Sequence, residues 1–520
     1  MKSNGIKYPV GIQTFGEIIS EGYLYVDKTA LIHELVNTEK YVFLSRPRRF
    51  GKSLLVSTVE EYFRGNRELF AGLAVSRLES EWTEYPVIRI DFTGENYQSP
   101  EKLLGKIDAL LRHYEDLYGL PEGNMSVALR FRRLILTAGE STGKRVVVLV
   151  DEYDKPLLDC IHDETLHEAH SQELQGFYSV LKECDAHIRF ALLTGVGKFG
   201  HVSIFSGLNN LRDISLNPKY NALCGISESE FRADFGASIR RFAESNGVSE
   251  DEAWETFRQN YDGYHFARTG EGLYNPFSVL NAFADNEIKA YWFRSGTPSM
   301  LIGILRRYPF PLNDLEGSEV SESELSDITR PADNLRALFY QTGYMTIKGY
   351  DSEFGLYRLG FPNLEVKSAF WDVLYRDYVA PGTSTAVFGI KNFIMDVRRG
   401  RPDDFMKRLQ SLIASISPGV ERKKEIHFQN ILEVVFKLLG LSVETEVTMA
   451  SGRCDMIVRT ADFVYLMEFK IDSTPQAALA QIREKGYARQ FASDHRRIYL
   501  IGANFSTASN TLDSYLIENA

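Results

Sequence analysis

Residues 45 to 53 read Ser-Arg-Pro-Arg-Arg-Phe-Gly-Lys-Ser, directly after the apolar run at 41 to 44 and directly before a helical pattern. A strand, a loop that ends in Gly-Lys-Ser and a helix follow the order of a phosphate-binding P-loop, because backbone amides and the helix N-terminus meet phosphate oxygens there. In that arrangement Lys52 reaches the β- and γ-phosphates and Ser53 ligates Mg²⁺, while Gly51 lets the backbone approach closely.

The loop departs from the standard expression GxxxxGK[ST], because Arg46 stands where the first glycine belongs. Gly-Lys-Ser alone is therefore weak evidence. Arg48 and Arg49 could clamp phosphates, face a neighbouring subunit or pair with local acids, and the sequence leaves these readings open. Together with Leu54, they complete the candidate nucleotide contacts around the loop.

A second apolar run, Val-Val-Val-Leu-Val at 146 to 150, leads into Asp151 and Glu152. A strand that ends in two carboxylates delivers them where open α/β sheets bind ligands, which is a Walker B pattern. We predict that Asp151 holds the Mg²⁺ shell and that Glu152 polarises the attacking water. Thr194 ends the next strand and would lie between the two motifs as a sensor of the γ-phosphate, although threonine there is often only structural.

A third constellation lies near the end of the chain, at 452 to 458 and 463 to 470, and reads as a β-hairpin. Alternate residues of a strand share a face, so Glu468 and Lys470 point together, and strand pairing brings Asp455 beside them. Two carboxylates gather Mg²⁺ or a related hard cation such as Mn²⁺, which polarises a phosphate and lowers the pKa of bound water. Lys470 would orient that water or stabilise the developing negative charge.

Further upstream, Glu433 lies in a helical stretch and could supply another metal ligand, although a solvated carboxylate on a helix face is the favoured reading. The favoured reading of Glu425 and Gln429 is likewise a solvated polar side chain on the helix face. A charged edge strand is the alternative for the hairpin itself. The apolar residues around Glu468 disfavour it, because they suit a buried strand better.

The surrounding pattern indicates the elements that position these groups. Short apolar runs alternate with helical stretches, which predicts an α/β multidomain fold with a buried, mainly parallel sheet. The predicted units are an α/β core at 1–220, a helical lid at 221–330, a winged-helix-like and helical connector at 331–415, and a last α/β domain at 416–520.

Length and composition agree with this division. A chain of 520 residues exceeds a single core, and 44% hydrophobic with 25% charged residues is typical of soluble proteins. The net charge of -11 excludes a globally positive surface, so any nucleic-acid contact must be local. No CxxC pair and no long apolar run occurs, which predicts a cytoplasmic protein with reduced thiols and no membrane partner.

The loop RPRRFGKS at 46 to 53 resembles the characteristic loop of the predicted AAA-ATPase-like proteins of bacteria. The similarity extends to residues 25 to 29, 151 to 156 and 205 to 211. The resemblance implies an AAA-like P-loop ATPase core that uses ATP and Mg²⁺. It also implies that Arg46 in place of glycine is typical of the family.

The Gly-Arg-x-Asp and Glu-x-Lys pattern, followed by a helix with Gln481 and Tyr487, resembles the PD-(D/E)XK nuclease domain that members of this family carry after the ATPase. The resemblance implies a restriction-endonuclease-like α/β domain. It also implies catalytic roles for Asp455, Glu468 and Lys470.

Together these features favour an ATP-regulated, metal-dependent nuclease, with DNA as the expected substrate. The alternative is an ATP-driven switch or scaffold whose last domain binds nucleic acid or a partner without cutting. A kinase or ligase would need a second acid/base pair, which we do not find. Arg212 and Arg294 are candidates for an arginine finger. A finger supplied by a neighbouring subunit would require a homo-oligomer.

Overall fold

The computed structural model describes residues 6–121, 125–198, 204–205, 208–295, 303, 305, 310, 312, 315–326, 334–378, 386–415, 434–435, 437, 444–447, 455–491, 494–509 and 511–520. The chain forms two compact units. The first comprises residues 1–296 and 316–366, and the second comprises 297–315 and 367–520. The finer boundaries at 220, 330 and 415 remain predictions.

A parallel sheet forms the centre of the first unit. Its strands pair in the order β2-β3-β4-β1-β5, and every pair is parallel. The strands are β1 (Tyr41–Ser45), β2 (Val87–Asp91), β3 (Val146–Asp151), β4 (Ile188–Gly195) and β5 (Arg212–Asp213). Every residue of β3 is buried. The predicted α/β layer is thus confirmed, and β4 lies between the two strands that carry the P-loop and the Walker B carboxylates.

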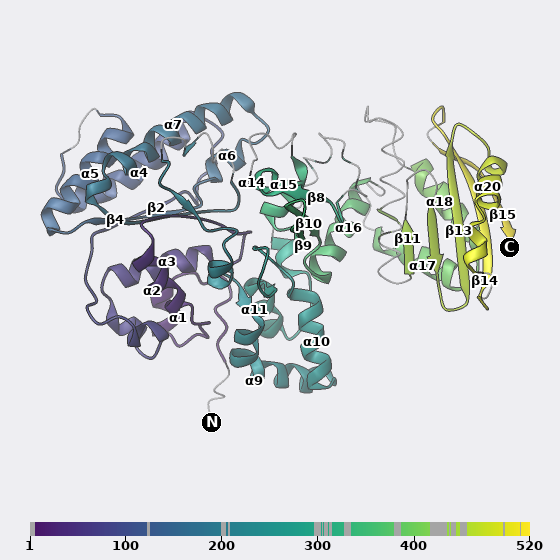
Figure 1. The fold of residues 1–520 in the computed structure, drawn as a ribbon, viewed down its shortest axis with the longest axis horizontal. Coiled ribbons are helices and arrows are strands. Elements are labelled where there is room, and N and C mark those ends of the chain that lie inside the picture. Colours follow the sequence, from purple (N-terminus) through teal and green to yellow (C-terminus); the bar gives the residue numbers. More distant parts are fainter. Residues whose placement is uncertain are drawn as a thin grey trace. The chain divides into compact units, whose positions relative to one another are not determined.

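Helices cover both faces of this sheet (Figure 1). One face carries α1 (Phe15–Ser20), α2 (Thr29–Thr38) and α3 (Lys52–Phe63), and the other carries α4 (Pro100–Leu117), α5 (Val127–Thr142) and α7 (Glu164–Glu183). The short helices η1 (Arg67–Phe70), η2 (Ala74–Arg77), α6 (Lys155–Asp159), η3 (Asp185–His187) and η4 (Pro218–Leu223) lie in the connections. Apolar residues of α2, α3 and the strands form one buried cluster, which fixes the helix after the P-loop against the sheet.

A mainly helical segment follows the sheet. It comprises β6 (Ile226–Ser227), α9 (Glu228–Asn246), α10 (Glu250–Tyr261), β7 (Leu273–Tyr274), α11 (Pro276–Asp285) and α12 (Tyr291–Ser295). Capping boxes start α9 at Ser227 and α10 at Ser249. Each serine side chain accepts a hydrogen bond from a backbone N–H in the first turn, which has no partner within the helix. Stacked aromatic rings form its core. The predicted helical character is confirmed, whereas its role as a lid remains a prediction.

The end of the first unit contains a small antiparallel sheet with strand order β8-β10-β9. Its elements are β8 (Glu319–Ser321), α14 (Glu322–Ser326), α15 (Leu335–Thr342), β9 (Thr346–Asp351), β10 (Leu356–Gly360) and α16 (Leu364–Tyr378). Helix α15, strands β9 and β10 and helix α16 lie within the predicted connector at 331–415. Its relation to winged-helix domains remains a prediction.

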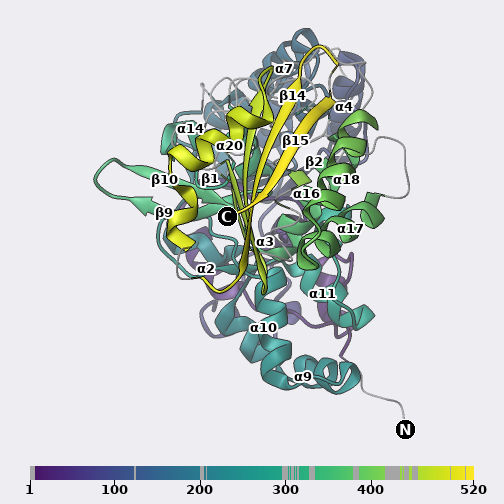
Figure 2. The same ribbon diagram turned by 90° about the vertical axis from the view of Figure 1, so that its right-hand side faces the viewer.

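The second unit contains a mixed sheet with strand order β11-β12-β13-β14-β15. Its elements are α17 (Ala386–Arg398), α18 (Pro402–Ser415), β11 (Glu444–Val447), β12 (Met456–Arg459), β13 (Phe463–Ile471), α20 (Pro475–Glu484), η6 (Tyr487–Phe491), β14 (Arg497–Ser506) and β15 (Thr511–Asn519). The strands β13 and β14 are parallel because α20 returns the chain between them. Figures 1 and 2 show α20 on one face of this sheet and α17 and α18 on the other.

Within the part of the chain that the structure describes, no helix has the length and apolar character to cross a membrane. Cys160, Cys184 and Cys224 are buried free thiols, as predicted. Cys454 lies outside the described residues.

Candidate functional site

The P-loop occupies the connection between β1 and α3. The chain leaves β1 at Ser45, and α3 begins at Lys52. Gly51 has φ +95°, a left-handed conformation that a side chain would strain, so the glycine before Lys52 is required by the backbone. Arg49 also has a positive φ, +67°. The sequence therefore folds locally as the motif predicted.

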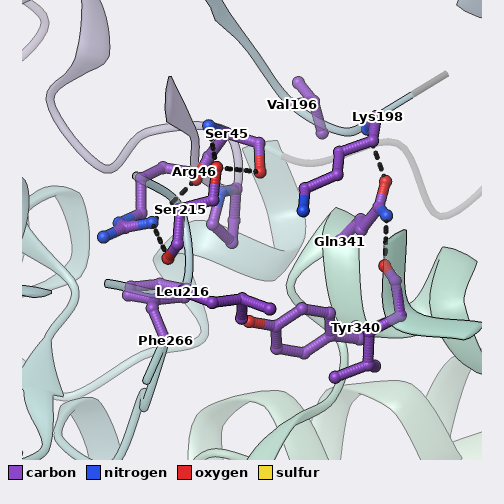
Figure 3. A pocket seen from close by; sticks show the side chains of 11 residues that line it. Ser45, Arg46, Val196, Lys198, Ser215, Leu216, Phe266, Tyr340 and Gln341 are labelled. Atoms are coloured by element: carbon purple, nitrogen blue, oxygen red, sulfur yellow. Dashed lines mark hydrogen bonds between the residues drawn. The ribbon is translucent and has the colours of Figure 1, made fainter. Parts of the chain in front are cut away.

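Arg46, at the place of the missing glycine, is a buried structural cation with 1% exposure. Its Nη1 donates to the carbonyls of Ser45 and Ser215, each at 2.9 Å, and Nη2 donates to the carbonyls of Tyr220 and Asn221 at 3.3 and 3.4 Å. Figure 3 shows the guanidinium beside Ser215. Burial lowers the pKa of Arg46. Arg46 thus ties the loop to the segment after β5.

Lys52 is almost fully buried under the loop, with 3% exposure. Its Nζ donates to the carbonyl oxygens of Arg46 at 2.9 Å and Pro47 at 3.2 Å, and lies 3.9 Å from Glu152 Oε1. The ammonium group therefore lies between the loop backbone and the Walker B carboxylate. The tertiary structure brings these two predicted motifs together across about a hundred residues of chain.

Asp151 and Thr194 face each other between β3 and β4. The Thr194 hydroxyl donates to Asp151 Oδ1 at 2.7 Å, and both side chains are buried. Asp151 Oδ2 is buried, receives no hydrogen bond, and lies 3.9 Å from Arg89 Nη2. A buried carboxylate oxygen without a donor suits a bound cation or its water. Glu152 follows with φ +55°, which turns the chain sharply at the strand end.

Asp154 is a fully buried residue next to the Walker B carboxylates, and sequence reasoning did not single it out as a site residue. Its Oδ2 accepts the backbone N–H groups of Val196 and Gly197 at 2.9 and 2.8 Å, so it fixes the chain just after β4. Burial, with a contribution from the negative charge of Glu152, raises the pKa of Asp154 to about 7. In the sequence, Asp154 was marked only by its place within the stretch 151 to 156 that resembles the family.

The segment after β4 is also tied to α15. The Lys198 N–H donates to Gln341 Oε1 at 2.6 Å, and Lys198 Nζ lies 2.5 Å from Asp213 Oδ2. The Gln341 amide in turn donates to the Leu325 carbonyl. Nothing in the sequence indicated the contact between Lys198 and Gln341, because it joins segments 143 residues apart.

One cleft in the first unit gathers most of the predicted nucleotide contacts. Its lining includes Arg48, Arg49, Gly51, Lys52, Ser53, Leu54 and Glu152, together with residues 9–13, Thr93 and the start of α11. The Arg49 guanidinium lies over the Phe277 ring at 4.8 Å. Asp151 and Thr194 are not among the lining residues. An adjoining apolar cleft shares Gly51 and Leu54 and is lined by Leu24, Tyr25, Val26, Ile32, Leu223, Ile226 and Leu280 among others.

The two clefts offer different chemistry. The first presents cationic side chains and the amides of a P-loop, which suit phosphates. The second presents aliphatic and aromatic side chains, which suit the flat face of a nucleoside base. Side by side, they match a ligand that is anionic at one end and apolar at the other.

The second unit brings together the three residues predicted in the hairpin. The Phe469 N–H donates to Asp455 Oδ2 at 2.9 Å, and the Asp455 N–H donates to Glu468 Oε2 at 3.4 Å. Lys470 Nζ donates to Glu468 Oε1 at 3.1 Å and to Gln481 Oε1 on α20. The predicted convergence of Asp455, Glu468 and Lys470 is therefore present, and Gln481 joins it.

Burial governs the electrostatics of this group. Glu468 is 1% exposed, and the side chain of Lys470 is 28% exposed. Burial raises the pKa of Asp455 to about 6, and the negative charge of Glu468 contributes to the rise. Two carboxylates held close together in a buried place suit a divalent cation, which would relieve their repulsion.

Two family models match separate parts of the chain. Residues 9–205 match the predicted AAA-ATPase model, and residues 423–514 match the PD-(D/E)XK nuclease superfamily. A protein from Azotobacter chroococcum mcd 1, described as an uncharacterized protein in the vnfD 5′ region, is 38% identical over 532 residues, and the match covers 99% of each chain. The chain belongs to the predicted AAA-ATPase family. Its domains are those of an ATPase followed by a nuclease-like domain.

Several candidates in this AAA-ATPase family member have less support. Glu433, Glu425 and Gln429 lie outside the described residues. Among the residues that are described, no group of three or more His, Cys, Asp or Glu side chains is arranged to hold a metal. Arg212 is exposed, forms an ion pair with Glu39 and is not among the residues that line the candidate nucleotide cleft.

Proposed function

We propose that this protein binds and hydrolyses ATP in the cleft of its first unit and hydrolyses phosphodiester bonds of DNA with the site on β13. The observation that carries the nuclease half is the convergence of Asp455 and Lys470 on the buried carboxylate of Glu468. The ATPase half is supported by Lys52 lying between the loop carbonyls and Glu152.

In the ATPase half, Lys52 exchanges its two loop carbonyls for the β- and γ-phosphates, and Arg48 and Arg49 neutralise further phosphate charge. Ser53 and Asp151 would hold Mg²⁺, which supplies charge neutralisation at the phosphates. Glu152 orients the attacking water, and Thr194 keeps Asp151 in place through its hydroxyl. The base lies in the adjoining apolar cleft.

In the nuclease half, Asp455 and Glu468 would hold Mg²⁺ or Mn²⁺, with Glu433 as a further candidate ligand. The metal supplies polarisation of the scissile phosphate and a lowered pKa of bound water. Lys470 is held between Glu468 and Gln481, and from there it orients the water or stabilises negative charge on the phosphate.

The alternative function is an ATP-driven switch whose second unit binds nucleic acid or a partner without cutting it. The burial of Glu468 and the ion pair that engages Lys470 favour this reading, because both groups are satisfied inside the protein. In a catalytic role Lys470 would use the third N–H of its ammonium group, because these two contacts engage only two of its three donors.

A cleavage assay separates the two functions. Linear, circular and single-stranded DNA are incubated with Mg²⁺ or Mn²⁺, with and without ATP, using wild type, Glu468→Gln and Lys52→Ala. We expect Glu468→Gln to reduce cleavage by at least about a hundredfold, the effect of losing one electrostatic group in an active site. Asp462→Asn, at the exposed hairpin turn, is the matched control and keeps full activity.

The response to ATP tests the coupling between the two activities. Cleavage that changes with ATP in wild type but not in Lys52→Ala supports an ATP-regulated nuclease. DNA binding without cleavage under all conditions supports the switch. Normal cleavage by Glu468→Gln would show that the hairpin is not the nuclease active site.

The proposed ATPase site also bears on the assembly of the protein. A complete ATPase site needs a cation at the γ-phosphate beyond Lys52, and Arg294 or a residue of a second subunit is the candidate. Light scattering with and without ATP would show whether a homo-oligomer forms. Steady ATP hydrolysis by a strict monomer would place the finger within the chain.

A further inference from the structure

Glu365 is a buried carboxyl in the first turn of α16. It is 4% exposed, and Asn363 caps the helix by accepting the Val366 N–H at 3.1 Å. The chain passes from the first compact unit to the second directly after Val366, within α16 itself. Glu365 therefore lies at the start of the helix through which the chain enters the nuclease-like unit.

Groups on two other helices donate hydrogen bonds to this carboxyl. The Ser278 hydroxyl on α11 donates to Glu365 Oε2 at 2.8 Å, and the Trp292 N–H on α12 donates to Glu365 Oε1 at 2.7 Å. The Phe293 N–H is a further donor. Because directed hydrogen bonds converge from two helices, Glu365 fixes their positions more specifically than apolar packing would.

The same two helices reach the nucleotide cleft. On α11, Phe277 lines the cleft and lies under the Arg49 guanidinium. On α12, Trp292 Nε1 donates to the Arg48 carbonyl of the P-loop at 2.8 Å. Continuous contacts thus lead from the P-loop through α11 and α12 to the first turn of α16.

The chemistry of Glu365 suits a holding role rather than catalysis. Burial raises the pKa of Glu365 to about 8, so the group is largely neutral at pH 7. A neutral carboxyl both donates and accepts hydrogen bonds, and a glutamine side chain can do the same. Glutamine is therefore the conservative replacement, and alanine removes the contacts.

We propose that Glu365 is a positioning residue that couples nucleotide occupancy of the cleft to the first turn of α16. The inference rests on the proposed ATP site. When phosphates engage Arg48 and Arg49, movement of the P-loop backbone shifts Trp292 and α11. Glu365 passes that shift to the helix that leads into the second unit.

Amide hydrogen exchange on the full chain tests this coupling. Exchange is measured with no nucleotide, with ADP and with a non-hydrolysable ATP analogue, for peptides that cover residues 46–54 and 364–378. In wild type we expect slower exchange in both peptides when the ATP analogue is added. In Glu365→Ala we expect the 46–54 response to remain and the 364–378 response to fall by about fivefold or more.

Two variants control for a merely structural effect. Glu365→Gln restores the response of the 364–378 peptide. Asp285→Ala removes an exposed contact between α11 and Tyr291 that does not involve α16, and it leaves both responses intact. If Glu365→Ala does not fold, the same exchange experiment on Ser278→Ala tests the coupling, because this variant removes one donor to Glu365 and leaves the carboxyl in place.

The failures can be told apart. If Glu365→Ala and Ser278→Ala both keep the full response of the 364–378 peptide, the coupling role is wrong and the ATP site stands. If wild type shows no response in the 46–54 peptide and no nucleotide binding, both the ATP site and the coupling fall together.

Discussion

Replacing Arg46 by glycine restores the standard P-loop expression GxxxxGK[ST], and pattern matching alone would call the change harmless. The structure predicts the opposite. Arg46 is 1% exposed, and four backbone carbonyls from three separate stretches of chain accept its hydrogen bonds. Its guanidinium carbon also lies 4.3 Å from the centre of the Phe266 ring.

The size of the effect follows from these contacts. Removing a large buried side chain costs about 2 to 5 kcal/mol when the site cannot collapse. Hydrogen bonds from a charged donor add roughly 1.5 to 3 kcal/mol each, offset by the cost of burying the cation. We expect Arg46→Gly to destabilise the first unit by about 3 to 5 kcal/mol, which lowers its melting temperature by roughly 6 to 10 °C at about 2 °C per kcal/mol.

The matched control is Arg49→Gly, the same substitution in the same loop. Arg49 is exposed and has φ +67°, a conformation that glycine adopts more easily, so this variant should melt within about 2 °C of wild type. Thermal unfolding and binding of a fluorescent ATP analogue are measured for both variants. Arg46→Gly with wild-type stability and affinity would refute the structural role of Arg46.

Three other outcomes follow from the structure. Gly195→Ala places a Cβ 2.6 Å from the buried ring of Tyr153, so we expect the free energy of unfolding, measured in urea, to fall by about 1 to 3 kcal/mol. The control Gly176→Ala meets open space on a helix and should not lower that free energy. The pKa of Glu365 is raised to about 8 from 4.5, so the folded chain holds an extra proton between these values and its stability falls as pH rises through them; Glu365→Gln should flatten that fall. Thr194→Val leaves Asp151 Oδ1 without its hydroxyl donor. We expect the rate of ATP hydrolysis, measured as released phosphate, to fall roughly tenfold, which equals about 1.4 kcal/mol in activation free energy, while nucleotide binding is retained.

The sequence predicted the main elements and the principal groups because their signals are local. Alternating apolar runs predicted the buried strands of the first sheet, and the hairpin pattern predicted that Glu468 and Lys470 share a face. The order strand, Gly-Lys-Ser and helix predicted the P-loop, and the positive φ of Gly51 gives the physical reason for that glycine. Each of these inferences depends on residues within one or two turns or strands of each other.

The sequence could not predict which distant groups meet. Nothing in the spacing of Arg46 indicated that carbonyls near residues 215 and 220 surround it, and nothing near Asp154 indicated that it accepts the Val196 N–H. The hydrogen bond from Ser278 to Glu365 joins residues that are 87 positions apart in the chain. Such contacts depend on how sheets and helices pack, so they cannot be predicted from composition or from the periodicity of apolar residues.

Residue types and their order along the chain determined the chemistry that is available here: a P-loop with Walker B carboxylates, and a pair of acids with a lysine on a strand. The tertiary structure alone decided the environment of each group. Burial raises the pKa of Asp455 and Glu365, and it turns Arg46 into a loop anchor, because the energy of a charge depends on the water and the partners that packing leaves around it.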